Sequence, residues 1–191
     1  MATVATKLIT AAEFYEFVHR PENRDRRFEL ERGEIVEMSR PGKKHGLVCA
    51  NGVRMLGNFA AGRKKGCVCS NDTGVVVERD PDMVRGPDIL FFEDVVRADE
   101  VEEKYGDTPP LLAVEVLSPN DTATQVTQRV IEQLNFGTQL VWVVDPDAEL
   151  IAVYRRGKQP YVVKKDEELT GDDVLPDFRC KVAEFFQLPG Q

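Results

Sequence analysis

Short apolar runs mark the middle of the chain. The runs "DILFF" at 88–92 and "LLAVEVLS" at 111–118 are apolar on both faces and rich in branched or aromatic residues. This composition is typical of strands at the centre of a sheet that is covered on both sides. Two more strands are predicted at 140–146 and 150–157, with an Asp-Pro turn between them. The pattern therefore predicts a buried sheet.

Three other segments, at 10–21, 47–62 and 121–137, have the apolar spacing of helices. Thr10 begins the first with the sequence of a capping box, and a glycine ends the second and the third. Asp121 is the predicted N-cap of the third helix. Because this helix follows one apolar strand and precedes another, it predicts a crossover between parallel neighbours.

The remaining segments are more polar. "RFELERGEIVEMS" at 27–39 predicts two strands with Gly33 at the turn, and "CVCSNDTGVVVERD" at 67–80 predicts one strand or a hairpin. Residues 93–110 are expected to form a loop with some helix, and the tail at 169–186 ends in a short amphipathic helix. The fold class is mixed α/β.

Length and composition add that the chain is an ordinary globular protein. Its 191 residues, 42% hydrophobic and 30% charged, fit one domain spanning 1–191. No apolar run approaches the ~20 residues of a membrane span. The N-terminus lacks a basic head followed by an apolar block, and the four cysteines suggest no disulfide framework. We expect a cytoplasmic protein with reduced thiols and no membrane partner.

The net charge of -8 argues against extensive wrapping of nucleic acid. A small binding site needs only a local basic rim. Such clusters occur at 24–27, 40–44, 63–65 and 155–158. Each is expected to be a solvated loop unless a site lies beside it.

Two acidic residues stand on segments that otherwise resemble core. Asp88 opens the first apolar strand, and Glu115 lies inside the second. Burying an unpaired carboxylate costs several kcal/mol, so Glu115 requires a partner, a raised pKa or a bound cation. If the strands pair with these faces aligned, the two carboxylates converge and attract a hard cation such as Mg²⁺ or Mn²⁺.

A simpler interpretation of each acid also exists. A buried arginine could neutralise Glu115, and Asp88 could serve only as the residue that follows Pro87 into the strand. The presence of both acids on neighbouring strands favours the metal site.

These residues carry a resemblance to a known group of proteins. A Pro-Asp pair opening a strand, followed by a glutamate inside the next strand, resembles the PD-(D/E)XK restriction-endonuclease-like superfamily. Within it the chain is similar to Uma-type endonucleases over nearly its whole length. The matching strings are "LITAAEF", "RFELERGEIVEMS", "GPDILFF", "LLAVEVLSPND", "FGTQLVWVVDPDAELIAVYRRG" and "LTGDDVLPDFRCKVAEFF".

The resemblance implies a nuclease core, with a mixed sheet flanked by helices. Carried over by position, Asp88 and Glu115 would be ligands of Mg²⁺ or Mn²⁺. Glu29 would complete the metal shell or orient a water. The implied reaction is hydrolysis of DNA phosphodiester bonds. By analogy with this fold family, we expect a homo-oligomer.

The sequence departs from the pattern beside the metal ligands. Leu117 stands where the superfamily has a lysine, and the position on the following helix that usually supplies this lysine in the Uma branch holds Arg129. Gln125 and Gln133 stand where an aspartate and a tyrosine are common. Arginine stays protonated and orients a water less adaptably than lysine. The alternative to a nuclease is therefore an inactive nuclease-fold domain that acts as a binding or assembly module.

Other candidate residues receive structural interpretations. The spacing of the cysteines and histidines matches no structural zinc site. We expect His45 to lie in a loop, although it occupies a position where the Uma branch often has a histidine. Ser118 has no evident base to activate it. Trp142 is expected in the core beneath the sheet.

Overall fold

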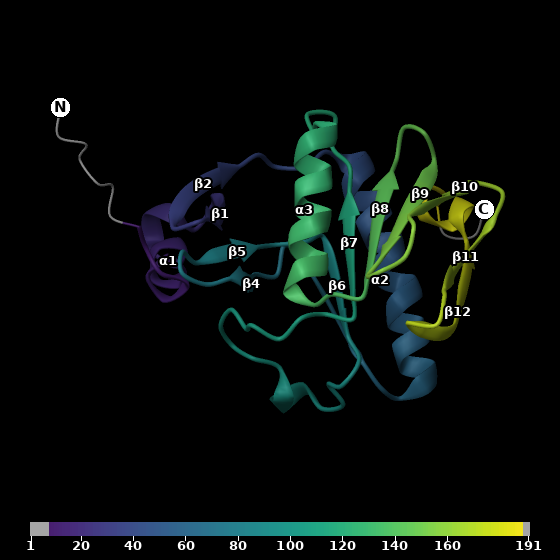
Figure 1. Cartoon of the computed structure of the whole chain (residues 1–191), viewed down its shortest axis with the longest axis horizontal. Coiled ribbons are helices and arrows are strands. Elements are labelled where there is room, and N and C mark those ends of the chain that lie inside the picture. Colours follow the sequence, from purple (N-terminus) through teal and green to yellow (C-terminus); the bar gives the residue numbers. More distant parts are fainter. Residues whose placement is uncertain (1–7, 189–191) are drawn as a thin grey trace.

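The computed structural model describes residues 8–188 and has a mixed sheet at its centre, which confirms the predicted mixed α/β class (Figure 1). The strand order in this six-stranded sheet is β10-β9-β8-β7-β6-β3. Its strands are β3 (Cys67–Ser70), β6 (Ile89–Phe92), β7 (Leu112–Val116), β8 (Leu140–Asp145), β9 (Leu150–Arg155) and β10 (Tyr161–Lys164). The four strands predicted from the apolar runs are all present.

One helix crosses from β7 to β8 and makes them parallel, as predicted. This helix is α3 (Ala123–Phe136), and every other strand pair in the sheet is antiparallel. Between β8 and β9, Asp145 Oδ1 accepts hydrogen bonds from the amides of Asp147 and Ala148, which confirms the predicted turn.

Helices cover the two faces of the six-stranded sheet. In Figure 1, α3 lies in front of the sheet and α2 (Lys43–Arg63) lies behind it. Val130 of α3 packs against Val141 and Val143, while α2 packs on the opposite face in the cluster that contains the fully buried Trp142. The core position predicted for the tryptophan is confirmed. No helix within residues 8–188 is long and apolar enough to span a membrane.

A smaller sheet lies beside the large one, at the left of Figure 1. Its strand order is β2-β1-β5-β4, and its strands are β1 (Arg27–Glu31), β2 (Glu34–Met38), β4 (Val75–Glu78) and β5 (Met83–Arg85). Helix α1 (Ala11–Val18) packs against it through Phe14. The predicted capping box of Thr10 is present, and Gly33 has the positive φ (81°) that the turn requires.

The tail forms a third sheet rather than mainly a helix. Strands β11 (Glu168–Gly171) and β12 (Leu175–Lys181) pair with each other, and the predicted amphipathic helix is only a 3₁₀ turn at Val182–Phe185. Val182 and Phe185 are buried in the core beside α2. Short 3₁₀ turns also occur at Pro21–Asn23 and Ala98–Glu100.

Helix α2 begins earlier than its apolar pattern indicates. It starts at Lys43 instead of residue 47, and it ends where Lys64 adopts a left-handed conformation (φ 53°) rather than at Gly62. Polar residues before the first apolar position carry no periodic signal, yet nothing in them interrupts a helix. His45 therefore lies in the first turn of α2, and its predicted loop position is wrong.

The segment 67–80 does not form a hairpin. Strand β3 pairs with β6 in the large sheet, whereas β4 pairs with β5 in the small one. Asn71 and Asp72 both have positive φ and lie where the chain passes from one sheet to the other. Strand β5 was not predicted, because three residues are too few to show an alternating pattern.

Thr122, and not Asp121, caps helix α3. The Thr122 side chain accepts a hydrogen bond from the backbone amide of Gln125. In turn, the Gln125 side-chain oxygen accepts one from the backbone amide of Thr122, which completes a capping box. Asp121 instead accepts a hydrogen bond from the Ser118 amide. Two adjacent residues could each cap this helix, and the local sequence does not distinguish them.

Candidate functional site

The strand register brings Asp88 and Glu115 together. Strands β6 and β7 are antiparallel, with Ile89 opposite Val114 and Leu90 opposite Ala113. Asp88 directly precedes β6 and therefore lies opposite Glu115, on the same face. Directly opposed residues in such a pair have Cβ atoms roughly 5 Å apart. The Val116 amide also donates to Asp88 Oδ2 at 2.7 Å, which holds the aspartate beside β7.

The two carboxylates line a cavity of about 700 Å³ that both sheets, α2 and the first half of α3 enclose. We call this cavity the acidic cleft. Its charged lining includes Glu29, His45, Asp72, Arg85, Asp88, Glu115, Asp121 and Arg129. All four residues proposed from the sequence (Glu29, Asp88, Glu115 and Arg129) thus face one cavity.

Glu29 enters the cleft from β1 and is held by two donors. Arg85 Nη1 donates to Glu29 Oε2 at 2.9 Å, and the Gly86 amide donates to Glu29 Oε1 at 3.2 Å. Arg85 also donates from Nε to Glu132 of α3 at 2.8 Å. One buried arginine therefore serves two carboxylates and joins the small sheet to α3.

Glu115 has an arginine beside it, and that arginine is Arg129. Arg129 Nε lies 3.3 Å from Glu115 Oε2, but it is buried without a hydrogen-bond partner among the described residues. The arginine instead donates from Nη2 to Asp121 at 2.7 Å. The neutralising arginine considered for Glu115 is therefore present, but it is shared with a second acid.

Burial raises the pKa of Glu115 to about 8, even though Arg129 acts to lower it. The carboxylates of Asp88, Glu29 and Asp121 add to the rise. In the metal-free protein Glu115 is therefore largely protonated at neutral pH. A bound cation would reverse this balance by favouring the charged form.

The contacts of Asp88 and Glu115 leave room for a cation. Arg129, the basic neighbour of Glu115, is shared with Asp121, and Arg85, which holds Glu29, is shared with Glu132 of the neighbouring groove. His45 is the basic partner of Asp88. Carboxylate oxygens are the ligands that hard divalent cations prefer.

His45 is part of this site. Its Nε2 lies 3.2 Å from Asp88 Oδ1, and its Nδ1 lies 3.4 Å from Cys49 Sγ, one turn further along α2. The hydrogen bond with Asp88 raises the pKa of the imidazole. Burial raises the pKa of the Cys49 thiol to about 12, so the thiol stays protonated in the metal-free protein.

Sequence reasoning missed Arg85 and the cleft roles of Asp121 and Asp72. Asp72 pairs with Arg27 at the edge of the cleft, and burial raises the pKa of this carboxyl. Asp121 follows β7 closely enough that its position at the end of a central strand could have suggested a role in the site. Nothing in the local sequence marks Arg85 or Asp72.

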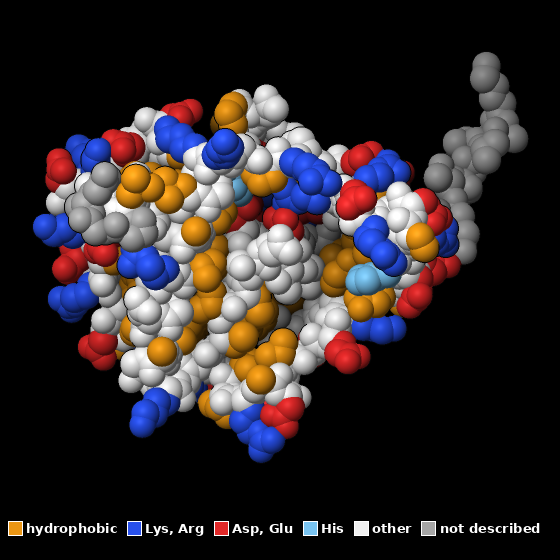
Figure 2. All heavy atoms as spheres, turned by 180° about the vertical axis from the view of Figure 1, so that it is seen from behind, with side chains coloured by type: hydrophobic (Ala, Val, Ile, Leu, Met, Phe, Trp, Pro, Cys, Tyr) orange, Lys and Arg blue, Asp and Glu red, His pale blue; other side chains and the backbone are white. Residues whose placement is uncertain are grey.

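Basic side chains contribute to the lining of the acidic cleft. Arg24, Arg26 and Arg27 line it, with Arg26 in an ion pair with Glu37 and Arg27 in one with Asp72. Figure 2 shows groups of Lys and Arg side chains on both sides of a hollow in which acidic and histidine atoms are visible. One of the basic clusters found in the sequence, at 24–27, therefore lies at a site.

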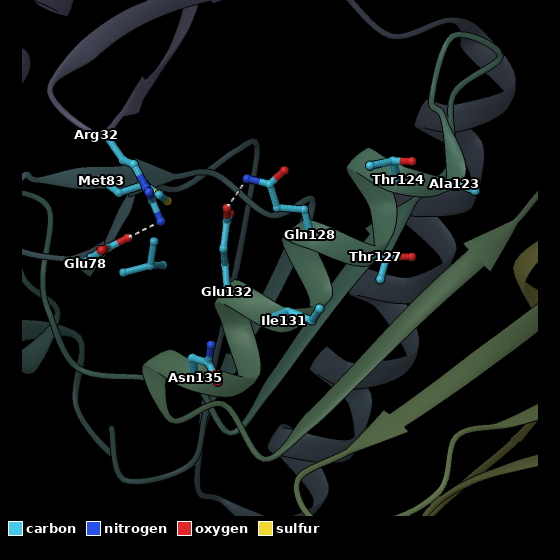
Figure 3. Close-up of a pocket in the computed structure, with 11 residues that line it drawn as sticks. Arg32, Glu78, Met83, Ala123, Thr124, Thr127, Gln128, Ile131, Glu132 and Asn135 are labelled. Carbon is cyan, nitrogen blue, oxygen red and sulfur yellow. Dashed lines mark hydrogen bonds and ion pairs between the residues drawn. The ribbon is translucent and has the colours of Figure 1, made fainter.

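A second, more open depression lies between α3 and the small sheet (Figure 3). This α3 groove has a volume of about 850 Å³, and its lining includes Arg32, Glu78, Gln128, Ile131 and Glu132. Its charges are paired: Arg32 contacts Glu78 at 3.7 Å, and Glu132 accepts hydrogen bonds from Gln128 and Arg85. It therefore provides no excess charge for a cation.

Comparison with known proteins identifies the family and the fold of the chain. Residues 12–183 match the Uma2 family, described as "Putative restriction endonuclease". The fold is similar to that of a protein from Anabaena variabilis described as "a putative nuclease belonging to DUF820". The TM-score is 0.76 at 23% identity, over 93% of this chain and 97% of that one. None of the curated proteins matches.

The family match covers most of the chain, whereas the structural likeness, at 23% identity, shows a shared fold. The resemblance seen in the sequence is confirmed. The chain belongs to the Uma2 family.

Proposed function

We propose that this protein is a nuclease that hydrolyses DNA phosphodiester bonds with Mg²⁺ or Mn²⁺ held by Asp88 and Glu115. The observation that carries the proposal is the buried Glu115 opposite Asp88, with a single basic neighbour, Arg129, that it shares with Asp121. Family membership supports the same reaction class.

The two proposed ligands are held in position by different contacts. Asp88 is positioned by the Val116 amide and by His45, which fix both of its oxygens. Glu115 is held by the pairing of β7 between β6 and β8. A divalent cation at these residues would polarise the phosphoryl oxygens and activate a water.

Glu29 and Arg129 are proposed to act on the reacting groups. Glu29 is fixed by Arg85 and the Gly86 amide, and we assign it the orientation of the attacking water. With the charge of Glu115 balanced by a cation, Arg129 is available to bind a phosphate oxygen. Its guanidinium suits this contact because it remains protonated and offers several donors.

The arginines of the cleft support DNA as the substrate. We assign Arg24, which lines the cleft, to contact with a phosphate of the entering strand. We further propose that residues 1–191 act as one domain in the cytoplasm and that copies of the chain associate. Light scattering of the purified protein tests the association.

A second candidate function is a binding or assembly module that no longer cleaves DNA. The contact between Arg129 and both Glu115 and Asp121 favours it, because this arginine replaces the expected lysine and is tied to the acids. In this case, DNA or a protein partner would bind without dependence on Asp88 or Glu115.

Plasmid cleavage in Mn²⁺ and in Mg²⁺ tests the proposal. Wild-type protein should nick or linearise the plasmid, and Asp88→Ala should remove this activity. Glu78→Ala, in the α3 groove, is the matched control and should cleave like the wild type. Absence of cleavage by the wild type, together with DNA binding that Asp88→Ala leaves unchanged, would favour the binding module. If the wild type does not cleave and Arg129→Lys does, the loss of activity is caused by the arginine that replaces the expected lysine on α3.

A further inference from the structure

His45, Cys49 and Asp88 form a compact group of three different ligand types. His45 and Cys49 are four residues apart on α2 and therefore share one face of the helix. One ligand atom from each of the three residues lies within 4.8 Å of the other two. The imidazole lies between the thiol and the carboxylate, at 3.4 Å from Sγ and 3.2 Å from Oδ1.

The two short distances run to opposite nitrogens of the His45 ring, so only one of these nitrogens can join the sulfur and the carboxylate oxygen on a single ion. Zn²⁺ binds sulfur at about 2.3 Å and nitrogen or oxygen at about 2.0–2.2 Å, so two ligands of one ion lie roughly 3.5 Å apart. Binding therefore requires the His45 ring to turn and the three ligand atoms, which lie within 4.8 Å of one another, to close to this spacing. Three protein ligands leave a fourth position for water, as in many zinc sites.

The ligand types distinguish this group from the pair Asp88 and Glu115. A thiolate and an imidazole favour Zn²⁺ and related borderline ions, whereas two carboxylates favour Mg²⁺ or Mn²⁺. Asp88 belongs to both sets. Its carboxylate faces His45 through Oδ1 and lies opposite Glu115 across the strand pair.

We propose that His45, Cys49 and Asp88 form a second cation site, selective for a thiophilic divalent ion such as Zn²⁺, and that its occupation inhibits the nuclease by removing Asp88 from the first site. Binding exchanges the thiol S–H bond for an S–Zn bond and releases the thiol proton to solvent, together with the second ring proton of those molecules in which His45 is protonated, without oxidation or reduction. The inhibition rests on the proposed nuclease function, but the binding does not.

Cobalt spectroscopy tests the binding without any activity. Co²⁺ substitutes for Zn²⁺ and gives an intense sulfur-to-metal charge-transfer band only when a thiolate is a ligand. The wild type should show this band and lose it on addition of Zn²⁺. Cys49→Ser should lack the band and bind Zn²⁺ at least about tenfold more weakly.

Cys67→Ser is the matched control, because Cys67 and Cys69 are another close pair of thiols, with their sulfurs 3.8 Å apart. It should keep the band. A band that survives in Cys49→Ser, a band lost in Cys67→Ser, or no band in the wild type would overturn the proposal. Protection of Cys49 from alkylation by Zn²⁺ in the wild type, read by mass spectrometry, provides a test that needs no variant; an equal alkylation rate with and without Zn²⁺ contradicts the site.

A crossed set of variants separates this site from the first one. Zn²⁺ binding should require Cys49 and not Glu115, Mn²⁺ binding should require Glu115 and not Cys49, and both should require Asp88. If the protein cleaves DNA, micromolar Zn²⁺ should inhibit the wild type and have much less effect on Cys49→Ser. Equal inhibition of the two proteins would contradict the inhibitory role. If the proposed Mg²⁺ or Mn²⁺ site fails through Glu115 alone, the cobalt charge-transfer band should remain unchanged.

Discussion

The two depressions on either side of α3 differ in how their charges are balanced. In the α3 groove, Arg32 pairs with Glu78. Their side chains are 65% and 42% exposed, so water screens both charges. In the acidic cleft, Glu115 is 8% exposed and shares Arg129 with Asp121. The two cavities are of similar size, yet only in the cleft does a buried carboxyl group share its single basic neighbour with another acid.

This difference is the reason for assigning the proposed chemistry to the acidic cleft. Exposed ion pairs contribute about 0–1 kcal/mol and occur on most protein surfaces. Buried acids with too few partners cost several kcal/mol, so a fold that keeps them needs another reason to do so. The proposed cation would supply that reason, and matched substitutions in the two cavities test it.

The largest expected difference concerns catalysis. Glu115→Gln preserves the shape of the side chain but removes a proposed metal ligand, so Mn²⁺-supported cleavage should fall more than about 100-fold. Glu78→Gln, which changes the groove in the same way, should retain the wild-type rate. Initial rates of plasmid nicking measure both. Similar losses in the two variants would remove the distinction between the cavities.

The next effect is on the pH dependence of stability. The folded-state pKa of Glu115, about 8, lies above its ordinary value of 4.5. Its contribution to the free energy of unfolding is therefore complete below pH 4.5 and is lost as the pH rises through 8. In EDTA, wild type should lose roughly 4 kcal/mol more than Glu115→Gln across this interval.

Urea unfolding of both proteins at several pH values measures this difference. Added Mn²⁺ should restore the stability of the wild type at pH 8, because it favours the ionised carboxylate. Parallel pH profiles for the two proteins would mean that Glu115 does not titrate in this range.

The stability cost of removing an arginine should also differ between the two cavities. Arg129→Ala removes the donor to Asp121 and the basic neighbour of Glu115, and it should reduce the free energy of unfolding by about 2 kcal/mol. Arg32→Ala breaks the exposed pair in the groove and should cost less than about 1 kcal/mol. Urea unfolding at pH 7 tests this, and equal costs would argue against uncompensated charge in the cleft.

The smallest effect is expected at the mouth of the cleft. If Arg24, which lines the cleft, binds a phosphate, Arg24→Gln should weaken DNA binding severalfold at low salt. The salt dependence of the binding constant should also become shallower, with a slope lower by about 1 for each phosphate that the variant no longer binds. Lys158→Gln is the control, since Lys158 does not line the cleft. Fluorescence anisotropy at several salt concentrations measures both quantities.

Much of the central sheet and the pair of acids could be predicted because they follow from local patterns. Strand alternation places Leu90, Ala113 and their acidic neighbours on defined faces, and the crossover fixes β7 beside β8. The cost of burying Glu115 is also visible in sequence, since a charge stands inside an apolar run. These features need no knowledge of the rest of the fold.

The partners of those acids could not be predicted because they come from distant segments. His45 reaches Asp88 only through an early start of α2, which polar residues conceal. Arg85 lies on a strand of three residues, and its contact with Glu132 depends on how α3 packs beside the small sheet. The pairing of Arg129 with Glu115 likewise depends on the rotation of α3.

Calorimetric titration with Mn²⁺, comparing wild type with Glu115→Gln at pH 7, tests the central claim most directly. The account predicts that the wild type binds Mn²⁺ and releases protons as it does so, since Glu115 must ionise. Glu115→Gln should bind at least about 100-fold more weakly and without this proton release. Wild-type protein that binds no Mn²⁺, or a Glu115→Gln variant that binds it equally well, would contradict a cation site in the acidic cleft.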